Sequence, residues 1–501
     1  MTDGLRLMVS FGVLACSAIG WGLAGYVGAG IGLIMGLVLL VIRWRRQPLW
    51  SWAALFFRRN RPMDLVGPST VANDRFGGAV RYQDGVAVAA IQILGRPYRP
   101  THVTGSITVA TANSLEIVDL VSAMRHGLGL TLDSISVVTA GSRRRSSGDY
   151  PRVYDTFIGT TPYAGQRETW LIIRLGALAN GDALRWRPTV GTAALAAAQR
   201  IAMALRSSGV RTKVATATDI VELEKRLGAS ALEPRNRRWH SVRGHLAWQT
   251  SYALRADEID SGILDQAWTL RADGIIQNVT IFPDGTCSAT VTVCEAQPPK
   301  ASPSVTLQTL PGEQVQAAAA ALCGPLPEIR GLTRSPLPPA LTVPIGPSGV
   351  LLGKTSNGER ILLPLGDPAE QTRIHIAAEE AIAKRIIIRT VAAGDRVTVH
   401  SAHVDSWDSI RMPNLAVIEH PRPVTGTTVS VVDGTVAPAP RPNTVISVGP
   451  PGTAGDSAAD IVIAQSGPQT IEVTVEGRSY VVEMEFFRAE NRYLSNLEMA
   501  D

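Results

Sequence analysis

The chain has 501 residues, of which 48 are Lys or Arg and 43 are Asp or Glu, and its formal net charge is +5. Residues 43–61 contain six arginines and no acidic residue, so the rest of the chain carries a net charge of −1. A basic charge confined to one short segment beside an apolar run indicates contact with anionic lipid head groups and argues against nucleic-acid binding. The four cysteines lack metal-ligand spacing and predict no metal site.

An uncharged apolar run of 36 residues, 7–42, dominates the N-terminal part of the chain. One helix of that length would reach about 54 Å, whereas the hydrocarbon core of a bilayer is about 30 Å thick. Glycines cluster in the middle of the run, and Trp21 and Tyr26 beside them are typical of a turn at the membrane surface. We therefore predict a two-helix transmembrane hairpin with spans at residues 5–22 and 26–42; one tilted span is the alternative.

Arginines flank this run on both sides. Arg6 precedes the first span and a group of arginines follows the second, so the positive-inside rule places both ends in the cytoplasm. The predicted localisation is the inner (cell) membrane, with a multi-pass topology and cytoplasmic N- and C-termini. Three glycines recur at four-residue intervals on the second span, namely Gly28, Gly32 and Gly36. Small residues at this spacing let helix backbones approach closely, either inside the hairpin or against the span of another subunit.

Residues 48–62, between the spans and the soluble part, are aromatic and basic. This composition predicts an interfacial helix lying under the membrane, and a linker helix packed on the first soluble domain is the alternative. The side chains that we expect at the membrane surface are Arg43, Arg45, Arg46, Trp50, Trp52, Arg58, Arg59 and Arg61.

Strand-like and helical patterns alternate after residue 62 and predict cytoplasmic α/β (mixed α+β) domains that follow the transmembrane hairpin. The predicted organisation begins with a transmembrane hairpin (1–47) and a juxtamembrane interfacial segment (48–62). A first cytoplasmic α/β domain (63–235), a mixed β segment with a proline-rich linker (236–344) and a second cytoplasmic α/β domain (345–501) follow.

Two segments of the last domain resemble nucleotide-binding motifs. Residues 349–355 (GVLLGKT) have three residues between their glycines where a phosphate-binding loop needs four. We predict instead a β-hairpin that turns at Asn357 and Gly358. Residues 373–400 predict a β-α-β unit, but the glycines with which a dinucleotide fold approaches a pyrophosphate are missing.

Two further polar clusters have simpler explanations. The cluster from His400 to Asp408 lies where a strand meets a helix, and Asp405 or Ser406 as a helix cap accounts for it. Residues 143–145 are three consecutive arginines, which we interpret as an exposed, solvated loop or as a contact for an acidic partner. No catalytic residue, no cofactor and no metal site is therefore predicted.

The two N-terminal spans are followed by four segments in a fixed order. These are residues 130–138 (LTLDSISVV), 167–175 (RETWLIIRL), an alanine-rich helix at 189–207, and 349–365 (GVLLGKTSNGERILLPL). In this order they resemble the EccE family, a membrane component of the mycobacterial ESX (type VII) secretion machinery, over nearly the whole chain. The resemblance implies a structural subunit at the periphery of the inner-membrane complex with EccB, EccC and EccD, which supports assembly, stability and protein export. It implies no established catalytic residues.

Two other functions stay open at this stage. The first is a membrane-tethered regulatory adaptor that binds a cytosolic partner, and only the identity of the partner separates it from a structural subunit. The second is a membrane-anchored enzyme with a degenerate nucleotide- or transferase-like fold. Because the phosphate loop and any acid-base or metal set are missing, we expect that the chain is not an enzyme.

Overall fold

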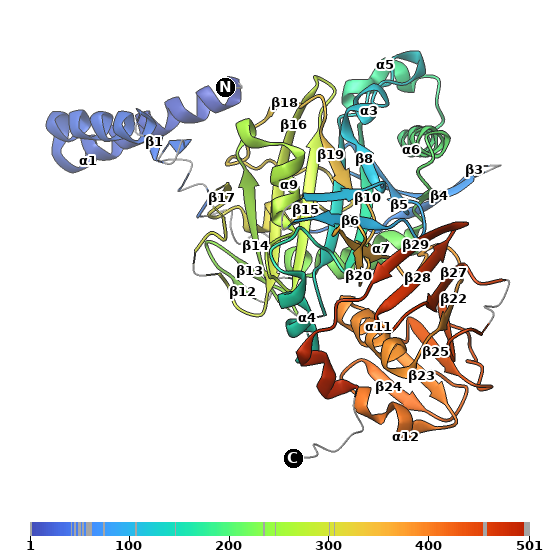
Figure 1. Ribbon diagram of the computed structural model, residues 1–501. Helices are drawn as coiled ribbons and strands as arrows, with labels where there is room; N and C mark the ends of the chain where they lie inside the picture. Colours follow the sequence, from blue (N-terminus) through green and yellow to red (C-terminus); the bar gives the residue numbers. More distant parts are fainter. Residues whose placement is uncertain are drawn as a thin grey trace.

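The computed structural model has an N-terminal apolar helix, α1, that projects from a body built on two large β-sheets (Figure 1). The expected order of an apolar N-terminal helical part followed by mixed α/β structure is therefore confirmed. The structure describes residues 3–41, 43–44, 47–48, 52, 55–56, 63–73, 76–105, 108–145, 147–233, 236–245, 247–299, 301–304, 306–453 and 458–494.

Helix α1 (Asp3–Val41) is one helical element where the sequence predicts two. Its backbone is not helical at Ala24 (φ −145°, ψ 25°) and Gly25 (φ 61°, ψ −141°), and this interruption lies between the two predicted spans. A positive φ suits glycine because it has no Cβ. Among the described residues, Ser10–Val38 is the one stretch of helix that is long and apolar enough to cross a membrane.

The two arms of α1 contact each other across the interruption. A Cβ on Gly32 would collide with the carbonyl oxygen of Cys16. Ser17 Oγ donates a hydrogen bond to the carbonyl oxygen of Ala29 at 3.2 Å. The rings of Trp21 and Tyr26, on either side of the interruption, pack edge to face with their centroids 4.4 Å apart.

The larger sheet has 13 strands, and all of its pairings are antiparallel. Its main path runs β12 (Asn236–Arg237), β13 (Val242–Arg243), β14 (Trp248–Leu254), β16 (Thr286–Glu295), β15 (Gly274–Ile281), β9 (Ser134–Ser142), β10 (Gln166–Gly176), β5 (Val86–Ile93), β4 (Phe76–Gln83) and β3 (Ser69–Asn73). Three short strands attach beside this path: β11 (Thr212–Val214) to β5, β17 (Leu307–Thr309) to β14 and β18 (Ser335–Pro336) to β16. The sheet thus continues across the predicted domain boundary after residue 235.

Helices cover both faces of this sheet. Ile91 in β5 packs in one core and its neighbour Ala90 in another, because successive side chains of a strand point to opposite faces. The first face carries α3 (Ile117–Ser122), α6 (Val190–Ser207) and α9 (Ser261–Ala267); the second carries α7 (Ala217–Leu227), α8 (Ala229–Leu232) and α10 (Gln314–Ala319). The predicted alanine-rich helix is confirmed as α6, which begins with a capping box between Thr189 and Thr192.

The second sheet has 12 strands and changes from parallel to antiparallel pairing. The parallel part runs β24 (Leu415–Ile418), β23 (Val397–Ser401), β25 (Val429–Asp433), β26 (Thr444–Gly449), β22 (Thr372–Ala377) and β27 (Ile461–Gln465). The antiparallel part continues with β28 (Thr470–Val475), β29 (Arg478–Glu483), β20 (Val350–Thr355), β21 (Arg360–Leu363), β6 (Thr101–Thr104) and β7 (Thr108–Thr111). Strands β6 and β7 come from the predicted first domain and join the sheet of the predicted last domain.

Helix α11 (Glu380–Ala393) packs under this sheet and against α4 (Tyr150–Ile158) (Figure 1). The predicted hairpin is confirmed by the pairing of β20 with β21, and the predicted β-α-β unit is confirmed by β22, α11 and β23. The remaining elements are short: β1 (Arg43–Trp44), β2 (Gln47–Pro48), β8 (Ser114–Glu116), β19 (Thr342–Pro344), α5 (Gly181–Leu184), α12 (Val404–Trp407), and the 3-10 helices η1 (Gly127–Gly129), η2 (Leu178–Asn180), η3 (Ala256–Glu258), η4 (Asp408–Ile410) and η5 (Arg488–Tyr493).

Candidate membrane anchor and polar sites

The small residues of α1 lie between its two arms. Gly28 faces the backbone of Gly20, and a Cβ on Gly36 would lie 3.2 Å from Cα of Val13. Together with Gly32, which faces Cys16, these glycines lie where the two backbones come close together. Their role in helix packing within lipid stays a prediction. Contact between this face and another subunit stays a prediction.

The segment after α1 contacts the body through aromatic side chains. The ring centroids of Trp52 and Phe56 lie 5.9 Å and 6.5 Å from that of Trp239, which stands between β12 and β13. Leu55 between them is buried. Of the other residues expected at the membrane surface, Arg43 belongs to β1, and the rest lie outside the described residues: Arg45, Arg46, Trp50, Arg58, Arg59 and Arg61. Contact of this segment with lipid stays a prediction.

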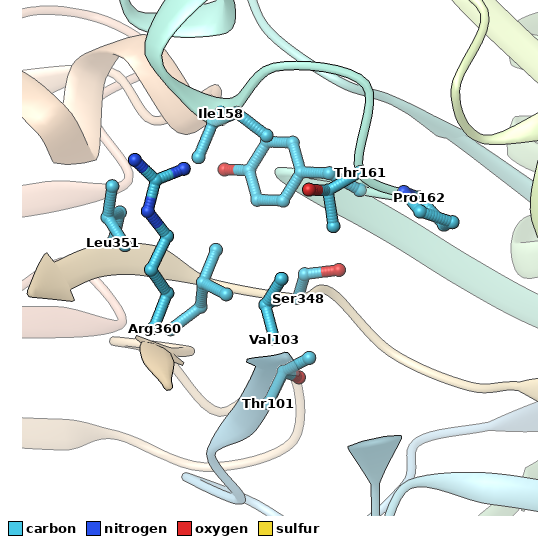
Figure 2. Close-up of a pocket in the computed structure, with 10 residues that line it drawn as sticks. Thr101, Val103, Ile158, Thr161, Pro162, Ser348, Leu351 and Arg360 are labelled. Atoms are coloured by element: carbon cyan, nitrogen blue, oxygen red, sulfur yellow. The ribbon is translucent and has the colours of Figure 1, made fainter. Parts of the chain in front are cut away.

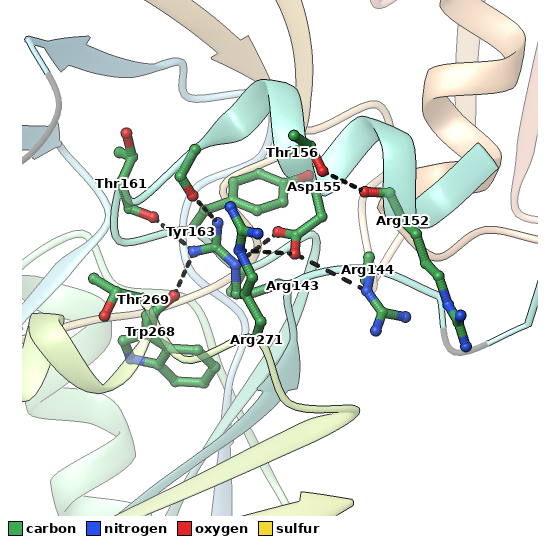
Figure 3. A network of polar contacts seen from close by, with 12 residues as sticks. Arg143, Arg144, Arg152, Asp155, Thr156, Thr161, Tyr163, Trp268, Thr269 and Arg271 are labelled. Atoms are coloured by element: carbon green, nitrogen blue, oxygen red, sulfur yellow. Dashed lines mark hydrogen bonds and ion pairs between the residues drawn. The ribbon is translucent and has the colours of Figure 1, made fainter. Parts of the chain in front are cut away.

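Arg143 corrects the interpretation of the arginine triplet. Its guanidinium is fully buried and pairs with Asp155, with Nε 2.8 Å from Oδ1 (Figure 3). It also donates hydrogen bonds to the carbonyl oxygens of Thr161 and Trp268, each at 2.6 Å, and of Gly159 at 2.8 Å. The prediction of an exposed loop or an acidic partner is therefore wrong for this residue, because its anion and its acceptors belong to the chain itself.

A second buried ion pair holds the C-terminal segment on α11. Arg389 in α11 and Glu490 in η5 are both fully buried, with Nε 2.8 Å from Oε1. Tyr150 Oη donates to the same carboxylate at 2.7 Å, and burial together with the Glu490 charge raises the pKa of this tyrosine. Arg389 also donates to the carbonyl oxygen of Leu351 at 3.1 Å. Arg389, Glu490 and Tyr150 therefore hold α4, α11, β20 and η5 together.

Lys354, the lysine of the phosphate-loop lookalike, lies within strand β20. Its Nζ is 2.9 Å from Oε1 of Glu485, and Arg360 Nε is 2.8 Å from Oε2 of the same carboxylate. Burial acts to raise the pKa of Glu485, but the hydrogen bonds from the two cations outweigh it and hold the pKa below its ordinary value. Through Glu485, Lys354 in β20 and Arg360 in β21 both contact the segment after β29. The lysine therefore has a structural partner within the fold.

The polar cluster after β23 has no metal geometry. His400 is buried between the carbonyl oxygen of His420, 2.9 Å from Nδ1, and Ser430 Oγ, 3.0 Å from Nε2, and burial lowers its pKa. Within the described ranges, no group of three or more His, Cys, Asp or Glu side chains is arranged to hold a metal ion. The expected cap is wrong: His403 occupies the N-cap position of α12 without a capping hydrogen bond from its side chain, and Asp405 and Ser406 lie inside the first turn.

A small cavity lies between strands β6, β20 and β21 of the second sheet and the end of α4 with the segment that follows it (Figure 2). Tyr163 and Arg360 line it with Thr161 and Ser348. Tyr163 Oη donates to the carbonyl oxygen of Gly349 at 2.9 Å. The cavity measures about 10 Å³, room for a single water molecule at most, so it is too small for a substrate.

These observations define a class: an α/β protein with an apolar N-terminal helix long enough to cross a membrane, whose conspicuous polar groups serve the fold. Comparison with known proteins gives the family. Residues 163–254 match the family described as "Putative type VII ESX secretion system translocon, EccE". Over an alignment of 506 positions the chain is 49% identical to the ESX-2 secretion system protein EccE2 of Mycobacterium tuberculosis (strain CDC 1551 / Oshkosh), covering 96% of this chain and 94% of that protein. The chain belongs to the EccE family.

More distant relatives belong to ESX secretion systems as well. The chain is 26% identical to the ESX-1 secretion system protein EccE1 of M. tuberculosis (strain ATCC 25618 / H37Rv), over 79% of this chain and 85% of that protein. It is 25% identical to the ESX-5 secretion system protein EccE5 of Mycobacterium marinum (strain ATCC BAA-535 / M), over 49% of this chain and 65% of that protein. The relationship therefore extends across three numbered ESX systems.

Proposed function

We propose that the chain is a structural subunit at the periphery of an ESX type VII secretion membrane complex, where it supports assembly, stability and protein export. The observation that carries this proposal is the 49% identity to an ESX-2 secretion system protein over 96% of the chain. The partners that we propose are EccB, EccC and EccD, together with membrane lipid; nucleic acid and a cofactor have no part in the proposal.

We propose further that the subunit acts without catalysing a reaction. The contacts of the two residues that most resemble catalytic groups support this. Lys354 pairs with Glu485, and His400 is buried between a carbonyl and a hydroxyl group. The side chain of Lys354 is 46% exposed, so replacing it should not disturb the core.

The test is complementation in cells that lack the chain. Wild-type protein and a Lys354→Ala variant should restore export of an ESX substrate equally. If Lys354→Ala abolishes export while the variant remains in the complex at the wild-type level, the lysine has a chemical role and the non-catalytic proposal is wrong.

The topology that we propose is a two-span hairpin in the inner membrane with both termini in the cytoplasm. Cys16 and Gly32 are in contact, although 16 residues of straight helix would separate them by about 24 Å. Each arm of α1 then has roughly the 20 residues that a single crossing needs. Arg6 near the start of α1 and the arginines after α1 support cytoplasmic ends.

Reporters inserted after residue 6 and after residue 61 measure this directly. Both should report the cytoplasmic side. Reporters on opposite sides would mean a single crossing, and the hairpin would have to be abandoned. The contact between the tilted rings of Trp52 and Trp239 supports a short tether, in which residues 48–62 hold the body close to the inner leaflet and their arginines contact anionic head groups.

A further inference from the structure

One loop of the body displays two large apolar side chains to solvent. Residues 177–187, which we call the docking loop, connect β10 to α6 and include η2 and α5. Leu178 is 99% exposed and Trp186 is 79% exposed. By contrast, Trp170 in the preceding strand β10 lies in the core, with 2% exposure. Two large apolar side chains on one short loop are therefore available for contact with a partner.

The docking loop is held firmly from beneath. Asn180 is buried; its Oδ1 accepts a hydrogen bond from the Thr131 amide at 2.8 Å, and its Nδ2 donates to the carbonyl oxygens of Thr131 and Gly176, each at 2.9 Å. Arg187 donates to the carbonyl oxygens of Ala183 and Gly127, at 2.6 Å and 3.1 Å. A loop fixed in this way loses little conformational entropy when a partner binds, so its exposed side chains are preorganised for binding.

The surroundings of the docking loop are basic. Arg125, Arg185 and Arg200 are exposed, and Arg187 is half-buried. Burial lowers the pKa of His126, and the positive charges of Arg200 and Arg187 lower it further. The guanidiniums of Arg187 and Arg200 therefore lie near the same histidine. The acidic residue of the loop, Asp182, is 3.4 Å from Arg185 in an ion pair that is almost fully exposed and therefore weak.

We propose that the docking loop binds an acidic protein surface with an apolar pocket for Trp186, on another subunit of the secretion complex. This inference rests on the proposed function. Tryptophan and arginine are the residues most enriched where binding energy concentrates in protein interfaces, and the basic surroundings of the loop complement an acidic partner.

A protein partner is favoured over the membrane by the place of the loop in the sheet. The juxtamembrane segment contacts Trp239 beside β12, and the docking loop follows β10. Six pairing steps of the sheet separate these two strands, which is about 29 Å at about 4.8 Å per step. Figure 1 likewise shows α5 and α1 on different sides of the body.

The first test places a photo-crosslinking amino acid at residue 186 of the full-length chain in its native membranes. The matched control carries it at Val481 in β29, which is 61% exposed. Residue 186 should yield an adduct with a peptide of another subunit that contains Asp or Glu, and the control should not yield that adduct. Adducts with lipid, adducts only within the chain, or no adduct would each overturn the proposal.

The second test measures co-purification of the full chain with the other ESX membrane components. The double variant Leu178→Ser, Trp186→Ser should lower recovery of the partner by about tenfold or more. The variant Arg185→Glu, Arg200→Glu should lower recovery at low salt and should remove the further loss that added salt causes for the wild-type chain, whereas Val481→Ser should have no effect. Full recovery with the first variant would contradict the proposed role of the docking loop and leave the proposed function of the chain untouched. If the wild-type chain itself co-purifies with none of these components, the proposed function fails instead.

Discussion

Helices α1 and α11 both carry many apolar side chains, and they lie in opposite surroundings. In α11 every residue from Ile382 to Ala393 is buried in the body, including three basic residues. In α1 the apolar side chains point outward: Phe11 is 72% exposed and Leu23 is 83% exposed. Apolar character therefore does not distinguish a core helix from a membrane helix.

The two helices differ in their charged side chains. α11 keeps Arg389 in its buried face because Glu490 and two backbone carbonyls accept its hydrogen bonds. The apolar run of α1 has no charged side chain after Arg6, as expected of a helix whose surroundings would offer a charge no partner. The comparison can be tested by removing a partner from the first helix and adding a charge to the second.

The largest effect is expected from Glu490→Gln. This change leaves Arg389 buried without its anion, and it should lower the free energy of unfolding by about 3–5 kcal/mol. Thermal and denaturant unfolding of the full chain in detergent would measure it. The control is Glu476→Gln, which removes an ion pair with Arg99 whose side chains are 40% and 24% exposed. That pair should contribute about 0–1 kcal/mol, and equal effects of the two variants would show that Arg389 does not depend on its partner.

A charge on the exposed side of α1 should be the next largest effect. Ile34 is 62% exposed, and an arginine there should raise the free energy of membrane insertion by about 2.5–3.5 kcal/mol. Resistance of the chain to alkaline carbonate extraction would fall, while Ile34→Leu would retain it. An Ile34→Arg chain that stays in the membrane like the wild type would mean that this helix does not face lipid.

The contact between the arms of α1 can be weakened without adding charge. A leucine at Gly32 would collide with Cys16 and should cost about 1–3 kcal/mol of packing, although leucine itself favours insertion. The control is Gly30→Leu, because nothing lies within 4 Å of a Cβ there. Cysteines placed at residues 17 and 29 in a Cys16→Ser background would report the contact. Cross-linking should drop in the Gly32→Leu chain alone; an equal yield in both variants would argue against close packing of the arms.

The smallest effect concerns Asp395, just after α11. Burial raises the pKa of this carboxyl from 3.8 to about 6, although Thr428 Oγ1 donates to it at 3.0 Å. Between about pH 4 and pH 6 the folded state therefore binds more protons than the unfolded state, so stability falls as pH rises through this window. The change should be roughly 1 kcal/mol once partial exposure is allowed for. Asp395→Asn should flatten this part of the curve of melting temperature against pH; an unchanged slope would assign it to another group.

Local patterns were enough to predict the parts of the fold that depend on neighbouring residues. The uncharged run predicts α1, and Asn357-Gly358 predicts the β20–β21 hairpin, because both signals lie within a few residues of the structure they specify. The joining of β6 and β7 to the second sheet could not be predicted in this way, because it pairs Val103 with Arg360 across more than 250 residues of sequence. Such pairings leave no periodic signal.

The same limit explains the buried Arg143. Arg143 was misjudged because its acceptors Thr161 and Trp268 are distant in sequence, so three consecutive arginines look alike whether exposed or buried. The docking loop did carry a signal that was missed: a tryptophan between two arginines, just before a proline, in a connection too short and polar to bury it. Exposed tryptophan in a polar loop is the pattern to look for in related chains.

The measurement that tests the account most directly is the composition of the complex that purifies with the full-length, tagged chain after gentle detergent extraction. If the chain is a structural subunit, EccB, EccC and EccD should be recovered with it at a fixed ratio that survives gel filtration. A chain recovered alone in its detergent micelle, beside an intact ESX membrane complex that lacks it, would show that it is not a subunit of that complex.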